Sequence, residues 1–228
     1  METISEHKCR YCEKSFKKES TLAVHLCEPK RRHQQQNEKG VQIGLNAYLR
    51  FYEMTQGSAK FKTYDDFAKS PYYNAFVKFG RQCVNINAIN VERYIDWLLK
   101  NNKKLDHWAK DSMYEEYLQQ YLRTEALTDA LQRAINYSIS WGEEKGCEPH
   151  DVLRYGNSNT VTYAISTGKI SPWIIYNCES GQQFLNNLNT DQIQIVWPWI
   201  DSDFWQKKFR DYPADQAYAE EILRQAGW

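Results

Sequence analysis

Three side chains near the N-terminus have the types and the spacing of metal ligands. Cys9 and Cys12 are separated by two residues, and His25 follows in the same stretch. This spacing lets both thiolates reach one ion from a tight turn, and an imidazole commonly completes part of a tetrahedral Zn²⁺ site. The pattern predicts metal binding, with zinc as the expected ion.

Two apolar residues occupy the positions that such a site needs for support. Phe16 lies between the cysteines and His25, and Leu22 lies three residues before His25. A module this small has almost no core, so an aromatic residue from a hairpin must pack against an aliphatic residue from a helix. Residues 1–33 therefore resemble the Cys2His2 zinc finger. The resemblance implies a ββα fold and a metal that supplies folding free energy on the order of 10 kcal/mol.

The fourth ligand departs from the finger pattern. The positions at which the family carries its second histidine hold Pro29, Lys30 and Arg31. Cys27 and His33 are the alternatives. Because proline disfavours helical geometry in the residue before it, we expect the helix to end near Leu26 and the thiolate of Cys27 to fold back. The sequence favours Cys27, and His33 stays the alternative because it needs a longer return.

The resemblance also implies a helix that contacts DNA bases in the major groove through positions −1, 3 and 6. Counting back from His25 as position 7 assigns these positions to Lys18, Thr21 and Val24. Only Lys18 is a strong base-reading donor, so little sequence specificity is expected, whereas the surrounding basic residues suit phosphate contacts. The candidate nucleic-acid-binding residues are Lys14, Lys17, Lys18, Thr21, Lys30, Arg31 and Arg32.

Charge and cysteine usage bound the class of protein. Basic and acidic residues are equal at 29 each, but residues 1–40 hold nine basic and six acidic residues, so a nucleic-acid contact is expected at this end. The six cysteines show no pairing pattern, which is typical of a reducing compartment. The sequence shows no signal segment and no apolar run of membrane-spanning length. We expect an intracellular protein without membrane contact, in the host cytoplasm if it is viral.

After the finger, apolar periodicity predicts helices. Residues 34–40 lack this periodicity and are predicted to form a mobile linker. The expected domains are a zinc finger over 1–33, the linker over 34–40 and an all-helical body over 41–228. The predicted fold class is mainly α, with a small N-terminal ββα finger followed by a multi-helix globular body.

Local signals place several of these helices. Ser70 and Pro71 predict a helix start with Tyr72 facing inward. A helix is expected from residue 128 to residue 145, closed by Gly146. Pro198 should interrupt the helix that begins near residue 191, and the alternation in residues 192–196 would also suit a short strand. Further starts are predicted at Thr63, Asn90, Asp111, Ser171, Asp203 and Pro213.

No catalytic residue can be assigned from the sequence. It contains no nucleophile elbow, no phosphate-binding glycine loop and no H-E-x-x-H motif. The first hypothesis is a zinc-binding nucleic-acid-associated accessory protein, with DNA favoured over RNA and a protein partner docked on the helical body. The second is an interaction adaptor whose finger is only a structural staple, and the third is an enzyme of nucleic-acid metabolism. In its short, Tyr- and Asn-rich style the chain is similar to uncharacterised accessory proteins of large tailed phages.

Overall fold

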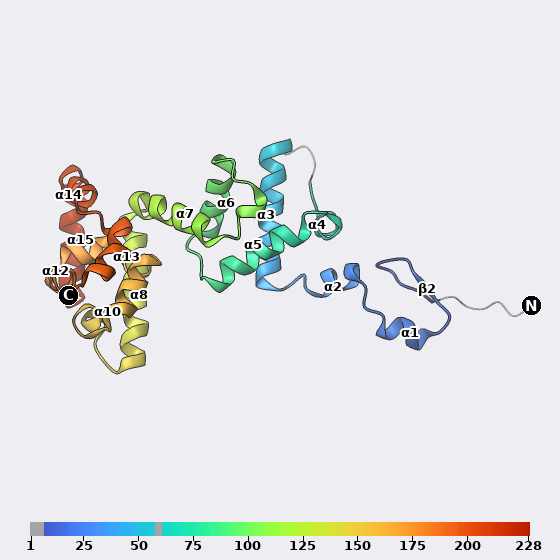
Figure 1. Ribbon diagram of the computed structural model, residues 1–228, viewed down its shortest axis with the longest axis horizontal. Helices are drawn as coiled ribbons and strands as arrows, with labels where there is room; N and C mark the ends of the chain where they lie inside the picture. The colour runs from blue at the N-terminus through green and yellow to red at the C-terminus, as the bar shows by residue number, and fades with distance from the viewer. Residues whose placement is uncertain (1–6, 58–60) are drawn as a thin grey trace, which may run out of the picture. The chain divides into compact units, whose positions relative to one another are not determined.

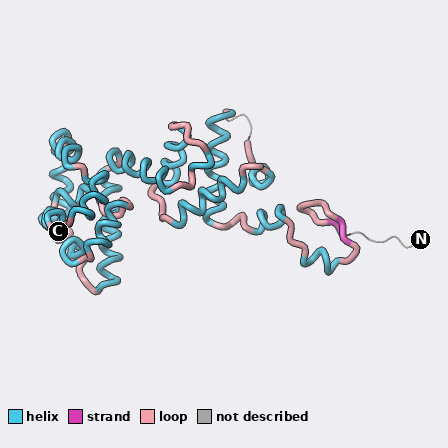
Figure 2. Tube along the Cα trace, viewed as in Figure 1, coloured by secondary structure: helices cyan, strands magenta, loops and turns pink. Residues whose placement is uncertain are grey.

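The computed structural model describes residues 7–57 and 61–228, and the chain folds as two compact units, residues 1–114 and 115–228 (Figure 1). Both units are built from helices, and a two-stranded hairpin near the N-terminus is the only sheet in the described residues (Figure 2). The predicted fold class, mainly α with a small ββα finger, is confirmed. No helix in the described part of the chain has the length and apolarity needed to cross a membrane.

The finger opens the first unit. Strands β1 (His7–Lys8) and β2 (Ser15–Phe16) pair antiparallel, and helix α1 (Glu19–Val24) follows them. A second helix, α2 (Glu28–Gln34), begins directly after Cys27. The segment 34–40, predicted to be a linker, holds the last residue of α2, a turn and the first two residues of α3 (Lys39–Gln56). The mobility of this segment stays a prediction.

The rest of the first unit packs aromatic side chains between short helices. Phe67, Phe76, Phe79 and Trp108 are fully buried, and Trp108 contacts both Phe76 and Phe79 edge to face. Helix α4 starts with the predicted Thr63 cap, and α6 starts with the predicted Asn90 cap. The elements are α4 (Tyr64–Lys69), α5 (Tyr73–Asn85), α6 (Val91–Lys100), the 3₁₀ turn η1 (Leu105–His107) and α7 (Asp111–Thr124), which continues into the second unit.

Glycines allow helices α3 and α5 to approach closely. A Cβ on Gly80 would lie 2.0 Å from the carbonyl oxygen of Gly40 and 2.7 Å from the backbone nitrogen of Gly44. Both distances are shorter than van der Waals contact, and both involve backbone atoms that cannot rotate away. The crossing therefore requires glycine at position 80.

Gly80→Ala is expected to destabilise the first unit by about 3 kcal/mol, the upper end of the usual range for overpacking, because α3 must move away from α5. Urea unfolding followed by circular dichroism measures the loss. Asn74→Ala, at an exposed position on the same helix, is the control and should leave the free energy of unfolding within about 0.5 kcal/mol. Equal stability of the two variants would show that the helices do not cross as described.

The second unit surrounds a cluster of large aromatic side chains. Trp173 and Trp205 are buried, and their ring centroids lie 5.9 Å apart, with Phe209 5.1 Å from Trp173. Gly146 ends α8 in the left-handed conformation, and Ser171 caps α11, as predicted. The elements are α8 (Leu127–Lys145), η2 (Pro149–Asp151), α9 (Val152–Tyr155), α10 (Ser158–Ser166), α11 (Pro172–Asn177), α12 (Glu179–Asn186), α13 (Thr190–Ile200), α14 (Ser202–Asp211) and α15 (Pro213–Gln225).

Two local predictions were wrong. Helix α5 begins at Tyr73, which is buried, whereas Tyr72 is 52% exposed. The Ser70 hydroxyl accepts a hydrogen bond from the amide of Tyr72, so a turn precedes the helix and shifts its face by one residue.

The second wrong prediction concerns Pro198, which lies inside α13 and does not interrupt it, so residues 192–196 are helical. Proline removes only one backbone donor from the helix, and the carbonyls at the helix end accept side-chain hydrogen bonds. The indole of Trp205 donates to Trp199 O at 2.8 Å, and the Tyr176 hydroxyl donates to Ile200 O.

Candidate metal centre

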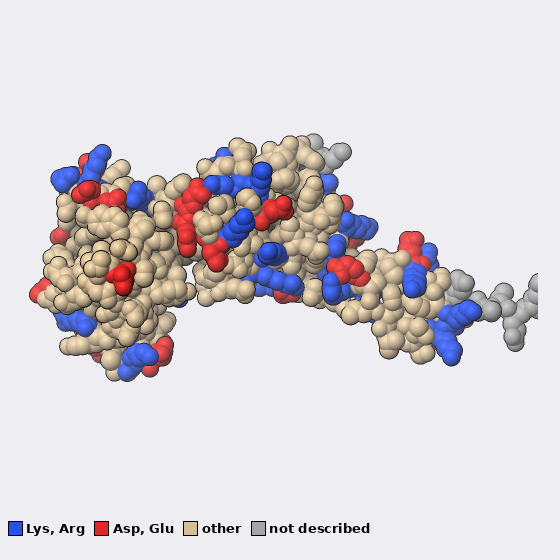
Figure 3. Space-filling view, in the orientation of Figure 1, with Lys and Arg blue, Asp and Glu red and all other residues tan. Residues whose placement is uncertain are grey.

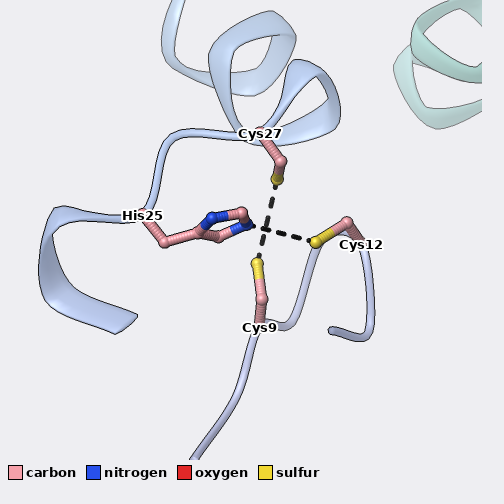
Figure 4. A group of neighbouring side chains, drawn as sticks. All are labelled: Cys9, Cys12, His25 and Cys27. Carbon is pink, nitrogen blue, oxygen red and sulfur yellow. Dashed lines mark hydrogen bonds between the residues drawn. The ribbon is translucent and has the colours of Figure 1, made fainter. Parts of the chain in front are cut away.

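Four side chains of the finger point toward a common centre (Figure 4). The sulfur atoms of Cys9, Cys12 and Cys27 and a ring nitrogen of His25 all lie within 4.8 Å of one another. Cys9 and Cys12 come from the hairpin, and the other two come from the segment between α1 and α2. The cluster can hold a metal ion, and the predicted preference for Cys27 agrees with it.

The hairpin turn positions the first two thiols. The amide of Cys9 donates to Lys14 O at 2.9 Å, and the amide of Glu13 donates to Cys9 O at 2.8 Å. Glu13 adopts a left-handed conformation with φ of 62°. This turn folds the chain back so tightly that both sulfur atoms face the same side.

Pro29 explains how the second pair arrives. Helix α1 ends at Val24, and His25 and Cys27 both have extended backbones. Cys27 is the N-cap of α2, and Pro29 occupies the first turn of that helix, where its missing amide hydrogen costs nothing. The proline therefore separates two helices, and the break between them turns Cys27 back to the cluster.

His33, the alternative fourth ligand, lies outside the cluster. Its ring packs against Tyr11 at 5.1 Å and against Tyr64 of α4 at 5.5 Å, measured between ring centroids. Its Nε2 lies 3.5 Å from a carboxylate oxygen of Asp65. His33 thus joins the finger to α4, a role that the sequence pattern did not indicate.

The distances within the cluster fit a tetrahedral metal site. Cys9 Sγ and Cys27 Sγ are 3.9 Å apart, and Cys12 Sγ is 3.3 Å from Nε2 of His25. Four ligands around one Zn²⁺ with Zn–S bonds of about 2.3 Å would place two sulfur atoms about 3.8 Å apart. The sulfur atoms are too far apart for a disulfide, and all these thiols are free.

Electrostatics also favour a cation at this centre. Hydrogen bonds from the backbone amides of Cys12 and Tyr11 lower the pKa of the Cys9 thiol to about 7. At Cys12 the amide of Lys14 acts in the same direction, but burial and the neighbouring Cys27 and Cys9 thiols outweigh it and raise the pKa of Cys12. Thiolates this close repel one another, and a bound cation would remove that penalty.

The finger has little else to hold it together. Helix α1 has no buried residue, and among residues 7–33, the described part of the finger, only Cys9 is buried. Phe16 packs on the ring of His25 with centroids 4.7 Å apart, whereas its predicted packing against Leu22 stays a prediction. So few apolar contacts cannot offset the conformational entropy of ordering the segment.

The predicted nucleic-acid-binding residues fall into two groups. The first group is exposed: Lys17, Lys18 and Thr21 lie around the start of α1, and Lys14 lies just before β2. The Lys30 ammonium donates to His25 O at 3.0 Å, and Arg31 pairs with Glu28.

Arg32 differs from this set because it holds the finger to the rest of the unit. Its side chain is only 17% exposed, and it donates to Ala68 O at 2.6 Å. Its guanidinium also lies 4.4 Å from the ring centre of Tyr73 in α5. The Tyr64 hydroxyl in turn donates to Arg32 O.

A separate cavity of about 560 Å³ lies in the second unit. Lys208 lines this cavity, and its ammonium donates a hydrogen bond of 2.7 Å to Arg123 O, at the end of α7. Burial lowers the pKa of this lysine. Arg123 pairs with Asp201, so two of the three cations that line the cavity, Arg123 and Lys208, have protein partners, and the third is Lys207. These residues cap helix ends, and no sequence motif marks them.

The chain matches no family model, no curated protein and no solved structure. The chemistry of the four converging side chains therefore carries the functional interpretation.

Proposed function

We propose that the protein binds one Zn²⁺ through Cys9, Cys12, His25 and Cys27, and that the metal is structural. The observation that carries this proposal is the closed set of four protein ligands, because catalytic zinc sites leave one position for water or substrate. Three thiolates and one imidazole are soft ligands that suit zinc better than magnesium or calcium. The metal would supply the folding free energy that the small finger core lacks.

The zinc-stabilised finger is proposed to contact nucleic acid, with DNA favoured over RNA. Counted from the start of α1 at Glu19, positions −1, 3 and 6 of the finger family correspond to Lys18, Thr21 and Val24, and the exposure of all three supports the proposal. Val24 is 82% exposed, although it is apolar, so no packing within the described chain accounts for its position. Lys17 and Lys14 add phosphate donors, which give affinity without sequence choice.

A second candidate function is that of a protein-interaction adaptor. Ile195 and Trp197 of α13 are 53% and 48% exposed, and Tyr163 of α10 is 62% exposed. Exposed aromatic and branched side chains on neighbouring helices are typical of protein contact surfaces. In this reading the finger serves only to fold the N-terminal segment.

Changing Lys14, Lys17 and Lys18 to Gln is expected to weaken DNA binding and to lower the slope of log K against log salt by about 3, since each phosphate contact contributes about 0.9. Fluorescence anisotropy of labelled single- and double-stranded oligonucleotides over a salt series measures both quantities. A triple Gln variant at the exposed Lys100, Lys104 and Lys110 is the control with the same change in charge. If the zinc-loaded wild type binds no oligonucleotide even at low salt, the nucleic-acid proposal fails and the adaptor candidate gains.

A further inference from the structure

A polar groove lies between α2 and α5 in the first unit. It encloses about 430 Å³, and its cationic lining residues are Arg31, Lys78 and Arg81, against one acidic residue, Glu28. Figure 3 shows Lys and Arg side chains over this region of α2 and α5. The groove thus has a positive excess in a protein whose net charge is zero.

The groove follows one face of α5. Asn74, Lys78, Arg81 and Asn85 line it and recur every three or four residues, so they lie along one side of the helix. The rise from Asn74 to Asn85 is about 16 Å at 1.5 Å per residue. A groove of this length offers several of these side chains to one extended ligand.

Several donors along this face are available to a ligand. Lys78, Asn74 and Asn85 are exposed, and their side chains make no hydrogen bond or ion pair with any other described residue. Arg81 donates to Glu38 at 2.7 and 2.8 Å, in a pair that is nearly half exposed on both sides. Because this pair is bidentate, a phosphate near Arg81 would share the guanidinium with Glu38.

The composition of the lining selects the kind of ligand. Cations and side-chain amides are the groups that bind phosphate and sugar oxygens in nucleic-acid complexes. The apolar lining is limited to the buried Tyr73 and Val77, which leaves little surface for an apolar peptide. An extended anion with regularly spaced charges fits a shallow polar groove of this length.

We propose that the groove between α2 and α5 binds the sugar-phosphate backbone of a nucleic-acid strand, with Lys78 as its main phosphate contact. This inference rests on the proposed nucleic-acid function and moves much of the contact from the finger helix to α5. Arg31 lines the α2 side, where it is paired with Glu28. Because Cys27 is both a cluster residue and the cap of α2, an ordered finger keeps that side of the groove in place.

The test is Lys78→Glu in the full-length zinc-loaded protein, with labelled single-stranded DNA, duplex DNA and single-stranded RNA as separate probes. Loss of one phosphate contact is expected to weaken binding at least about tenfold at 0.1 M salt and to lower the salt slope by about 1. Lys110→Glu, an exposed lysine in the same unit, carries the same change in charge and should bind within about twofold of the wild type. Circular dichroism checks that both variants are folded.

The outcomes separate this inference from the proposal beneath it. A selective loss in Lys78→Glu supports the groove, and the probe with the largest loss identifies the strand type. If the wild type binds a probe and the two variants Lys78→Glu and Lys110→Glu bind it with equal affinity, the groove proposal is overturned while the nucleic-acid function stands. If the wild type binds none of the three probes, both proposals are overturned.

Discussion

Cys27→Ser is expected to remove stoichiometric zinc from the purified protein. A serine hydroxyl is not a zinc ligand at neutral pH, so only three of the four converging side chains would be left. Removal of a residue that only hydrogen-bonds to a ligand lowers metal affinity roughly 10–100-fold, and removal of the ligand Cys27 should lower zinc affinity by more than that. Metal analysis of the purified protein and a competitive titration with a chelating dye measure the stoichiometry and the affinity.

Two variants control this experiment. Cys147→Ser removes an exposed thiol of the second unit and should leave one zinc per chain. His33→Asn removes the alternative ligand, and it should also retain the metal because His33 packs against Tyr11 and Tyr64 instead. Zinc lost in His33→Asn and retained in Cys27→Ser would show that the fourth ligand had been assigned to the wrong residue.

Loss of the metal should spread beyond the ligands. Cys27 caps α2, and α2 carries the Arg32 and His33 contacts to α4 and α5. We therefore expect chelation to increase amide hydrogen exchange throughout residues 7–34, while the crossing of α3 and α5 stays protected. Protection of α2 that is unchanged after chelation would contradict this coupling.

The parts of the site that the sequence predicted are local. Cys9 and Cys12 share one turn, and Pro29 decides where α1 ends, so short-range rules were enough to bring Cys27 to the cluster. The contact between Arg32 and Ala68 spans 36 residues, and no local pattern encodes it. Arg32 therefore looked like one more basic residue of a flexible flank.

In the fold, too, local features were predicted from the sequence and long-range ones were not. Capping residues such as Thr63 and Asn90 gave correct helix starts because the cap lies within the turn that it stabilises. The division between the two units falls inside α7, between Tyr114 and Glu115, where no glycine, proline or polar run marks it. Pro198 was misjudged because the local proline signal was given more weight than the packing of α13, in which Val196, Trp199 and Ile200 are buried on both sides of it.

The second large effect is expected at Glu125, whose side chain is completely buried between α7 and α8. Its two carboxylate oxygens accept hydrogen bonds from Arg133 at 2.6 and 2.8 Å. Arg133 also donates to Gly168 O at 2.7 Å, so this ion pair connects α8 to the segment after α10. Glu125→Ala would leave the Arg133 charge, which is only 18% exposed, without its carboxylate.

Breaking a buried pair by removing one partner costs about 3–5 kcal/mol, so Glu125→Ala should lower the free energy of unfolding of the second unit by that amount. Urea unfolding followed by tryptophan fluorescence measures it, because Trp173 and Trp205 are buried in this unit. Glu143→Ala, an exposed glutamate on α8, is the matched control and should change stability by less than about 0.5 kcal/mol. Equal stability of the two variants would show that Arg133 does not depend on Glu125.

The pH dependence gives an independent check on the same pair. Burial raises the pKa of Glu125 above its usual value, although Arg133 opposes the shift. Between the unfolded and folded pKa values the native state binds more protons than the unfolded state, so the contribution of Glu125 to stability falls as pH rises through that window. Glu125→Gln cannot titrate and should lose this slope while retaining an oxygen acceptor for Arg133. A Gln variant that kept the slope would assign it to another group, and the buried carboxylate would then contribute only through its contact with Arg133.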